Sequence, residues 1–384
     1  MPSPLRWDIF CTVVDNYGDA GLAWRLARQL ADEHGHSAHL YVDALASLAR
    51  IAPGIDVTRD EQMAHGVSVH RWNGPHGDLP FSPPADVVIE AFGCGLPPSY
   101  LNAMARRDPK PIWINLEYLS AEDWIESCHG LASRHPQLPL TRYFFFPGFT
   151  ATSGGLLRER DLLARRDAFQ SDAGAKTALW RKLALPEPAA GTRLLSLFCY
   201  PNAGSPVLFD AWAQGVEPIL CVLPEGVASA KPATWAGRSP PPPGQTLSRG
   251  RLMLATIPFL AQDDYDRLLW ACDVNFVRGE DSFVRAQWAA RPFVWDIYKQ
   301  ADDAHRLKLD AFLARYRAGL AQHAATAMES FWRAWNDDSD ASPLWDAFDA
   351  SREPLRTHAK AWAAMLATRT DLVSELVDFV AGLI

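Results

Sequence analysis

Paired or clustered cysteines are missing from this chain of 384 residues. Its six cysteines are scattered, without a C-x-x-C pair and without the spacing of a zinc site. Most lie in apolar segments, a pattern typical of buried free thiols in a reducing compartment. The first residues, MPSPLRWDIF, lack the charged leader and long apolar core of a signal peptide. We therefore expect a cytoplasmic protein.

A net positive charge and long apolar runs are also lacking. The formal net charge is −8, which argues against a general nucleic-acid binder with a basic stripe. No uninterrupted apolar run reaches the roughly 18 residues needed to span a bilayer. The sequence therefore predicts no nucleic-acid partner and no membrane partner. Hydrophobic residues make up 48% of the chain and charged residues 21%, so we expect a well-packed globular protein.

Several sequence motifs of common enzyme classes are absent. There is no G-x-S-x-G string and no Cys/His nucleophile signature. The histidines show no metal-ligand pairing, and no D-x-D string demands a metal ion. We therefore expect no metal site.

Short apolar runs alternate with helical patterns along most of the chain. This alternation predicts parallel sheets with helices on both faces. It pauses at residues 170–191, a candidate linker, and gives way to helical patterns after about residue 301. The Pro-rich segment 239–250 is expected to be a loop. The interpretation is an α/β protein with two Rossmann-like domains, residues 1–175 and 190–355, facing each other across a cleft, and a helical C-terminal tail.

The first candidate site is TVVDNYGDAGLAW, residues 12–24, between a predicted strand and a predicted helix. It holds only G-x-x-G, and its carboxylates Asp15 and Asp19 would repel a pyrophosphate, although Asp43 ends the next strand where a ribose-binding acid would lie. A structural alternative is that Asp19 caps the helix and Asp15 makes a turn. Together, the two aspartates favour a carboxylate pair aimed at a cationic or hydroxylic group.

The second candidate is NFVRGEDSFVRAQWA, residues 275–289. Arg278 follows a predicted strand, and Glu280, Asp281 and Ser282 occupy the first turn of a predicted helix. Backbone N–H groups and the helix dipole make such a start an anion site. Arg278 can add a bidentate fork, and Ser282 a hydroxyl donor. The alternative is that the acidic residues only cap the helix.

Two further turns carry aromatic side chains. In LFCYPNAGS, residues 197–205, Tyr200 can donate to a phosphate or pack half-buried. In TIPFLAQDDYD, residues 256–266, Phe259 and Gln262 offer an aromatic face and an amide, which suit stacking on a base and reading its edge. Core packing of Phe259 fits the sequence equally well.

Long and unusual strings of the sequence resemble one known family. WDIFCTVVDNYGDAGLAWRLARQLA and RGEDSFVRAQWA, with IEAFGCGLP, WINLEYLSAEDWIES and YFFFPGFTATSGGLLRE, are similar to the bacterial protein-arginine rhamnosyltransferases that modify elongation factor P. The similarity extends over essentially the whole chain.

The resemblance implies an inverting glycosyltransferase of the GT-B fold. Its donor would be dTDP-β-L-rhamnose, bound by the C-terminal domain, and its acceptor one arginine of elongation factor P, held by the N-terminal domain. A last helix within residues 360–384 would cross back to the N-terminal domain. No cofactor is implied.

The resemblance also implies roles for individual residues. The catalytic residues would be Asp15, Asp19 and Glu280. The nucleotide-sugar donor would be held by Phe198, Tyr200, Phe259, Gln262, Arg278, Asp281 and Ser282. A guanidinium is always charged and a poor nucleophile, and a carboxylate pair can hold it in a fixed fork. We expect Asp19 to be the general base and Asp15 to orient the guanidinium, with the roles exchangeable.

Two other functions fit the same patterns. A nucleotide-sugar epimerase of the same fold would use the donor without a protein acceptor. A non-catalytic module that binds a ribosome-associated factor would need neither the carboxylate pair nor the diphosphate site.

Overall fold

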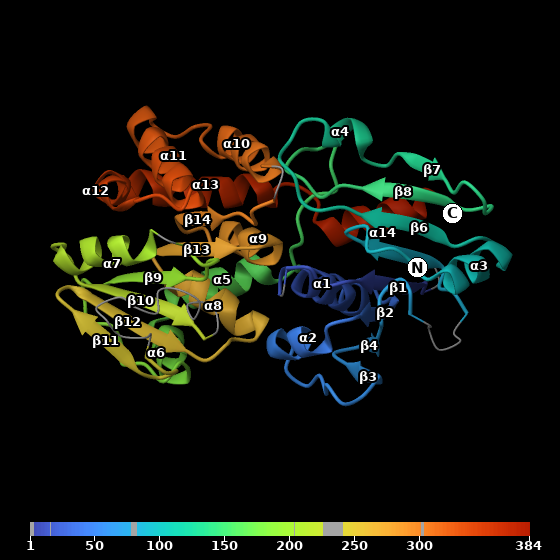
Figure 1. Cartoon of the computed structure of the whole chain (residues 1–384), viewed down its shortest axis with the longest axis horizontal. Helices are drawn as coiled ribbons and strands as arrows, with labels where there is room; N and C mark the ends of the chain where they lie inside the picture. The colour runs from blue at the N-terminus through green and yellow to red at the C-terminus, as the bar shows by residue number, and fades with distance from the viewer. Residues whose placement is uncertain (1–3, 16, 78–82, 203, 226–240, 301–302) are drawn as a thin grey trace. The chain divides into compact units, whose positions relative to one another are not determined.

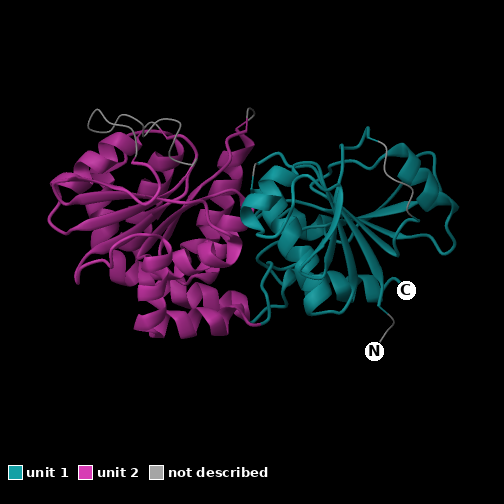
Figure 2. Cartoon of the chain, turned by 90° about the horizontal axis from the view of Figure 1, so that it is seen from below, with its two compact units in different colours: residues 1–160, 368–384 teal, residues 161–367 magenta. Residues whose placement is uncertain are grey.

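The computed structural model describes residues 4–15, 17–77, 83–202, 204–225, 241–300 and 303–384. The chain forms two compact units, coloured separately in Figure 2. Unit 1 contains residues 1–160 and 368–384, and unit 2 contains residues 161–367.

Unit 1 is built on an eight-stranded sheet with strand order β3-β4-β2-β1-β5-β6-β8-β7 (Figure 1). The inner strands pair in parallel, whereas β3 and β7 run antiparallel to their neighbours at the two edges. The strands are β1 (Arg6–Cys11), β2 (Ser37–Val42), β3 (Glu61–Ala64), β4 (Val67–Arg71), β5 (Val87–Ala91), β6 (Ile112–Leu116), β7 (Ala132–Arg134) and β8 (Thr141–Phe145). The helices are α1 (Gly18–Asp32), α2 (Leu45–Ile51), α3 (Pro98–Arg106), α4 (Ile125–Cys128) and α14 (Leu372–Ala381).

Helix α1 follows from the apolar spacing of its sequence. Leu22, Leu26 and Leu30 recur at helical intervals and are buried. Gly35 ends the helical segment in the left-handed region, with φ +67°, and its N–H donates to Ala31 O at 3.2 Å. The N–H of His36 donates to Leu30 O at 3.0 Å, so the chain leaves the helix directly into β2.

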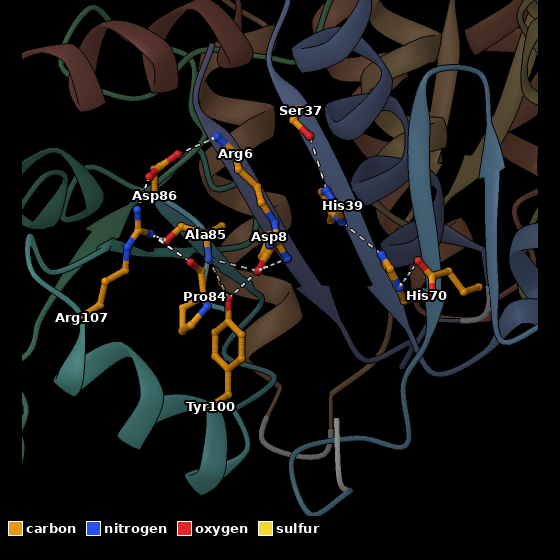
Figure 3. Close-up of polar contacts among 11 residues, drawn as sticks. Arg6, Asp8, Ser37, His39, His70, Pro84, Ala85, Asp86, Tyr100 and Arg107 are labelled. Atoms are coloured by element: carbon orange, nitrogen blue, oxygen red, sulfur yellow. Dashed lines mark hydrogen bonds and ion pairs between the residues drawn. The ribbon is translucent and has the colours of Figure 1, made fainter. Parts of the chain in front are cut away.

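A buried polar cluster joins α3 to β1 (Figure 3). Asp8 lies on β1 with no exposed surface, and the Tyr100 hydroxyl of α3 donates to its Oδ2 at 2.6 Å. Arg6 forms an ion pair with Asp8 at 3.1 Å. Burial raises the pKa of Asp8, but these donors partly offset the effect. On the neighbouring strands, His39 Nδ1 lies 3.1 Å from His70 Nε2.

Unit 2 is built on a six-stranded sheet with strand order β11-β12-β10-β9-β13-β14. All its pairings are parallel except that of β11 with β12. The strands are β9 (Arg193–Leu197), β10 (Ile219–Pro224), β11 (Thr246–Arg249), β12 (Leu252–Ile257), β13 (Val274–Arg278) and β14 (Phe293–Asp296). The helices are α5 (Leu162–Ser171), α6 (Ala173–Lys182), α7 (Ser205–Gln214), α8 (Gln262–Ala271), α9 (Glu280–Trp288), α10 (Ala304–Tyr316), α11 (Gln322–Asn336), α12 (Ser342–Ala350) and α13 (Arg352–Ala367).

The loop predicted for residues 239–250 needs a correction. Thr246–Arg249 form β11, which pairs antiparallel with β12. The prolines end before this strand begins, so they do not prevent its pairing. Residues 239 and 240 of the predicted loop lie outside the described part of the chain.

The boundary between the units lies at residues 160 and 161, earlier than the predicted linker. Helix α5 belongs to unit 2 because its side chains contact that unit. Gln170 Nε2 donates to Trp270 O at 3.3 Å and to Ala289 O at 3.1 Å, and Arg166 donates to Trp288 O at 2.9 Å. These contacts place residues 161–175 in unit 2 instead of the predicted N-terminal domain.

The C-terminal segment changes units at residue 368. Trp362 of α13 donates to Gln287 Oε1 at 2.8 Å and belongs to unit 2. Beyond it, Leu372 N donates to Leu156 O at 3.0 Å, and Gln29 Nε2 of α1 donates to Asp371 Oδ1 at 2.9 Å. Of the helices within the described ranges, none is long and apolar enough to span a bilayer.

Candidate functional site

The loop after β1 is held by carboxylates on both sides. Val13 N donates to Asp43 Oδ1 at 2.9 Å. Val14 N and Asp15 N both donate to Asp19 Oδ2, at 2.8 and 2.9 Å. Three consecutive backbone N–H groups are therefore satisfied by carboxylate oxygens, which fixes the path of the loop that carries Asp15.

Asp19 is a buried carboxylate, 1% exposed, in the first turn of α1. Burial raises its pKa above the usual range, while the two backbone hydrogen bonds and a hydrogen bond from Tyr118 lower it. The neighbouring charge of Asp15 raises the pKa further. A carboxyl with a raised pKa binds a proton more readily than an ordinary aspartate, as a general base requires.

The structure shows how the capping alternative applies to the two aspartates. Tyr17 occupies the N-cap position of α1 without a side-chain cap hydrogen bond. Asp19 instead reaches back to the loop before the helix. Asp15 forms a turn through its backbone, because Gly18 N donates to Asp15 O at 2.8 Å.

Two aromatic residues that the sequence did not indicate extend the contacts of Asp19 within unit 1. Tyr118, after β6, hydrogen-bonds to Asp19. Its ring stacks on Phe92, after β5, with centroids 4.3 Å apart. Phe92 has φ +59°, an uncommon backbone conformation for a bulky side chain. A single aromatic residue after a strand has no spacing signal, so only the fold brings these residues to Asp19.

In unit 2, an arginine lies over two aromatic rings. The Arg278 guanidinium carbon lies 4.9 Å from the Phe198 ring centroid and 4.7 Å from that of Tyr200. Arg278 also donates to Cys199 O at 3.3 Å. Such stacking fixes a planar cation while keeping its charge available to an anion.

Helix α9 begins directly beside this arginine. Gly279 is its N-cap, with φ +63°, a conformation that favours glycine. In the first turn, Asp281 Oδ2 accepts from Gln262 Nε2 at 3.2 Å, and Ser282 hydrogen-bonds to Tyr265. Glu280 is the first helical residue and is partly exposed.

The remaining predicted donor residue, Phe259, follows β12 and is partly buried. Its ring lies 6.4 Å from that of Phe198. The loops after β9, β12 and β13 therefore gather at the carboxyl edge of the sheet, where parallel α/β folds bind ligands. The predicted residues of unit 2 that the structure brings together there are Phe198, Tyr200, Phe259, Gln262, Arg278, Glu280, Asp281 and Ser282.

Asp296 is a further member of this edge that the sequence did not indicate. It accepts the Tyr200 N–H at 2.7 Å and thereby holds the backbone of the Tyr200 loop. Its pKa is raised to about 7, because burial outweighs the hydrogen bond from Tyr200 and the charges of Lys299 and Arg278. A buried aspartate at the end of a strand otherwise looks like a turn residue in the sequence.

Comparison with known proteins decides the family. Residues 7–381 match the family described as "Elongation-Factor P (EF-P) rhamnosyltransferase EarP". The chain belongs to this family. Proteins named protein-arginine rhamnosyltransferase in Pseudomonas putida and Pseudomonas aeruginosa are 50% and 46% identical to it. The matches cover 97% and 98% of this chain, and 98% of each relative.

A solved structure extends the EarP comparison to three dimensions. It was reported as the structural basis for EarP-mediated arginine glycosylation of translation elongation factor EF-P, and is 37% identical to this chain with a TM-score of 0.70. The alignment covers 99% of this chain and 100% of that one. An Arabidopsis thaliana protein, UGT89C1 complexed with UDP-L-rhamnose, shares the fold at 11% identity, with a TM-score of 0.54 and 99% of each chain covered. The predicted GT-B fold and glycosyltransferase class are confirmed.

Proposed function

We propose that the chain transfers L-rhamnose from dTDP-β-L-rhamnose to one arginine side chain of elongation factor P, with inversion at the anomeric carbon. The acceptor would bind unit 1 and the donor unit 2. Membership of the EarP family supports the acceptor. Translation factors work in the cytoplasm, so the proposal places the reaction there.

The observation that carries the proposal is the loop at Asp15 and Asp19. A guanidinium has a pKa above about 12, so it needs carboxylates to hold it and to accept its proton. Asp19 is buried and has a raised pKa, which suits the base, while Asp15 sits on a loop fixed by its own N–H bond to Asp19. Loss of the proton to Asp19 would leave a nitrogen lone pair to attack the anomeric carbon.

On the donor side, the leaving group is a diphosphate whose negative charge grows in the transition state. Arg278 and the N-terminus of α9 supply positive charge at the same sheet edge. We propose that they do so without a metal ion. Tyr200 and Ser282 would donate to the phosphates, and Phe259 with Gln262 would contact the thymine. The proposed catalytic role of Glu280 is contact with the sugar or support of this loop.

The test is mass spectrometry of elongation factor P after incubation with the enzyme, dTDP-β-L-rhamnose and EDTA. We expect the mass of one deoxyhexose to be added at a single arginine. Unmodified acceptor at saturating donor would contradict the proposal. Consumption of donor without any acceptor protein would favour the nucleotide-sugar epimerase.

Asp19→Asn is the matched variant for this assay. An amide oxygen can still accept the N–H groups of Val14 and Asp15 but cannot take up a proton from the acceptor. We expect kcat to fall by at least about 100-fold, the usual contribution of a general base. Binding of dTDP, measured by calorimetry, should not change; a strong loss of dTDP affinity would contradict the assignment of the base.

A further inference from the structure

Unit 1 contains a cavity that is lined by none of the residues assigned to the proposed reaction. Its volume is about 380 Å³, and it lies beside α3, β6, β8 and the edge strand β7. Polar lining residues are Glu90, Trp113, Ser133, Arg134, His135 and Arg142, while Leu96, Leu101 and Pro136 add apolar surface. This volume suits a small organic molecule or a single side chain of a partner protein.

Arg142 is one of the two arginines that line the cavity. Its Nη1 lies 3.3 Å from Glu90 Oε2, and its guanidinium lies over the rings of Trp113 and Phe144, at 5.2 and 5.0 Å from the centroids. The side chain is still 32% exposed. It is therefore held in place but keeps part of its surface toward the solvent and the cavity.

Glu90 is already occupied by donors from the protein. Besides Arg142, its carboxylate accepts Gly95 N at 2.9 Å and Trp113 Nε1 at 3.1 Å. Its side chain is only 3% exposed. Glu90 is the only carboxylate among the described residues that line the cavity, and it is thus poorly placed to bind a cationic ligand.

The other polar groups of the lining add donors. His135 Nδ1 accepts the N–H groups of Gln137 and Leu138, at 3.2 and 3.0 Å, so the proton of its neutral ring is on Nε2. Arg134 and Ser133 are exposed on β7. Donors therefore outnumber free acceptors around a partly apolar space.

We propose that this cavity binds a carboxylate attached to a small apolar group, with Arg142 and Arg134 as its cationic partners. A planar carboxylate matches the fork of an arginine, and the leucines and proline would contact the apolar part. The carboxylate belongs either to a free small molecule or to an acidic side chain of the acceptor protein. The site itself does not depend on the proposed function, because its first test needs no donor and no turnover.

The first experiment titrates the full chain with benzoate and follows binding by saturation-transfer NMR. We expect saturable binding that Arg142→Gln weakens about tenfold or more, as for the loss of a charged hydrogen bond. Arg71→Gln is the matched control, because Arg71 is also ion-paired in unit 1 and is 35% exposed, and it should leave the affinity unchanged. Leu101→Trp, which fills the cavity, should abolish binding even if Arg142→Gln disturbs folding.

The second experiment identifies the source of the carboxylate. If it comes from the acceptor protein, then saturating benzoate and Arg134→Ala should each raise the KM for elongation factor P and leave the KM for the donor unchanged. If it comes from a free molecule, benzoate binds the cavity and neither KM changes. Two results together overturn the proposal. The first is that benzoate does not bind, or that its binding is unaffected by Arg142→Gln and Leu101→Trp. The second is that Arg134→Ala does not change the KM for elongation factor P. Failure of rhamnosyl transfer alone would leave the benzoate result standing.

Discussion

The carboxylate of Asp19 both holds the loop before α1 and titrates in a way that its surroundings control. Its Oδ2 holds the N–H groups of Val14 and Asp15, and its protonation is tuned by burial and by Tyr118. The first task fixes the loop, and the second sets the pH at which the carboxylate can accept a proton. Substitutions that separate the two tasks are the most informative at the scale of single residues.

Tyr118→Phe should shift the pH dependence of catalysis. The Tyr118 hydroxyl lowers the pKa of Asp19, so its removal raises that pKa further. If Asp19 must be deprotonated to act as the base, the acidic limb of the kcat profile moves to higher pH. Tyr143→Phe is the control, because it removes a tyrosine hydroxyl from the same unit, but from a ring that packs against Phe379, with centroids 5.6 Å apart. An acidic limb that stays in place or moves to lower pH would contradict the role of Tyr118.

Asp296→Asn should change how stability depends on pH. The folded-state pKa of Asp296 is raised to about 7, whereas that of an unfolded aspartate is about 3.9. The stability contributed by this group is therefore fully present below about pH 4 and is lost as the pH rises to about 7. Over this pH range, the free energy of unfolding of the wild type should fall by roughly 2 to 4 kcal/mol relative to that of Asp296→Asn, at about 1.4 kcal/mol per pKa unit. Urea unfolding at pH 4.5, 6 and 8 measures the difference; parallel curves would show that the pKa is not raised.

At the scale of elements, the sequence predicted the inner parts of both sheets well. The apolar runs WDIFCTVV, SAHLYVD and ADVVIEAF correspond to β1, β2 and β5, because continuous apolar runs mark strands that are buried on both faces. The edge strands β3, β7 and β11, and the inner strand β8 next to β7, were not predicted. The edge strands are short and mostly exposed, so neither an apolar run nor an alternating pattern identifies them. In β8 most residues are only half-buried, and polar Thr141 and Arg142 interrupt the apolar run.

In the candidate sites, too, the sequence predicted the features that a local pattern marks and missed those that depend on contacts between distant segments. The glycines and charged residues after β1 and β13 predicted loops at strand ends, and the fold places Arg278 beside Phe198 and Tyr200. The contact of Tyr118 with Asp19 joins the loop after β6 to the first turn of α1, far apart in the sequence, and no local pattern contains that information. The roles proposed for Asp15, Asp19 and Glu280 stay predictions until kinetics test them.

Gly155 lies where the N-terminal part of unit 1 contacts its C-terminal part, residues 368–384. Its φ is +68°, and a Cβ added there would lie 2.5 Å from the Thr370 carbonyl oxygen. We expect Gly155→Ala to destabilise the protein by about 1 to 3 kcal/mol more than Gly35→Ala, because overpacking adds to backbone strain. Gly35 has φ +67° and no atom within 4 Å of its added Cβ, so it reports the strain alone. If thermal unfolding shows the same loss of stability for both variants, the segment at Thr370 moves away from the added methyl group without an energetic cost.

At the scale of the whole molecule, each unit has its own sheet and core, but unit 1 is discontinuous in sequence. Helix α14 buries Leu372, Val373, Leu376 and Val380 in that unit. Its N-cap Asp371 also accepts from Gln29 of α1. The sequence between the two parts of unit 1 forms a complete second unit.

Deletion of residues 368–384 should therefore affect the two units differently. We expect unit 1 to lose hydrogen-exchange protection, because the side chains under α14 become exposed to solvent. The affinity for dTDP should stay unchanged, since the proposed donor residues all lie in unit 2. Asp371→Ala, which removes the N-cap and the acceptor of Gln29 but leaves α14 in place, should cost about 1 to 3 kcal/mol and serves as the milder comparison. A large loss of dTDP affinity in the deletion would contradict the independence of the units.

The discontinuity of unit 1 also has a consequence for the order of folding during synthesis. Translation proceeds from the N-terminus, and domains generally fold as units once their residues have emerged. Strands β1 to β8 leave the ribosome first, yet α14 becomes available only after residues 161–367 have been made. Unit 2 can thus be complete while unit 1 still exposes the surface that α14 covers. In the nascent enzyme, the unit that we propose binds the donor is therefore complete before the unit that we propose binds the acceptor.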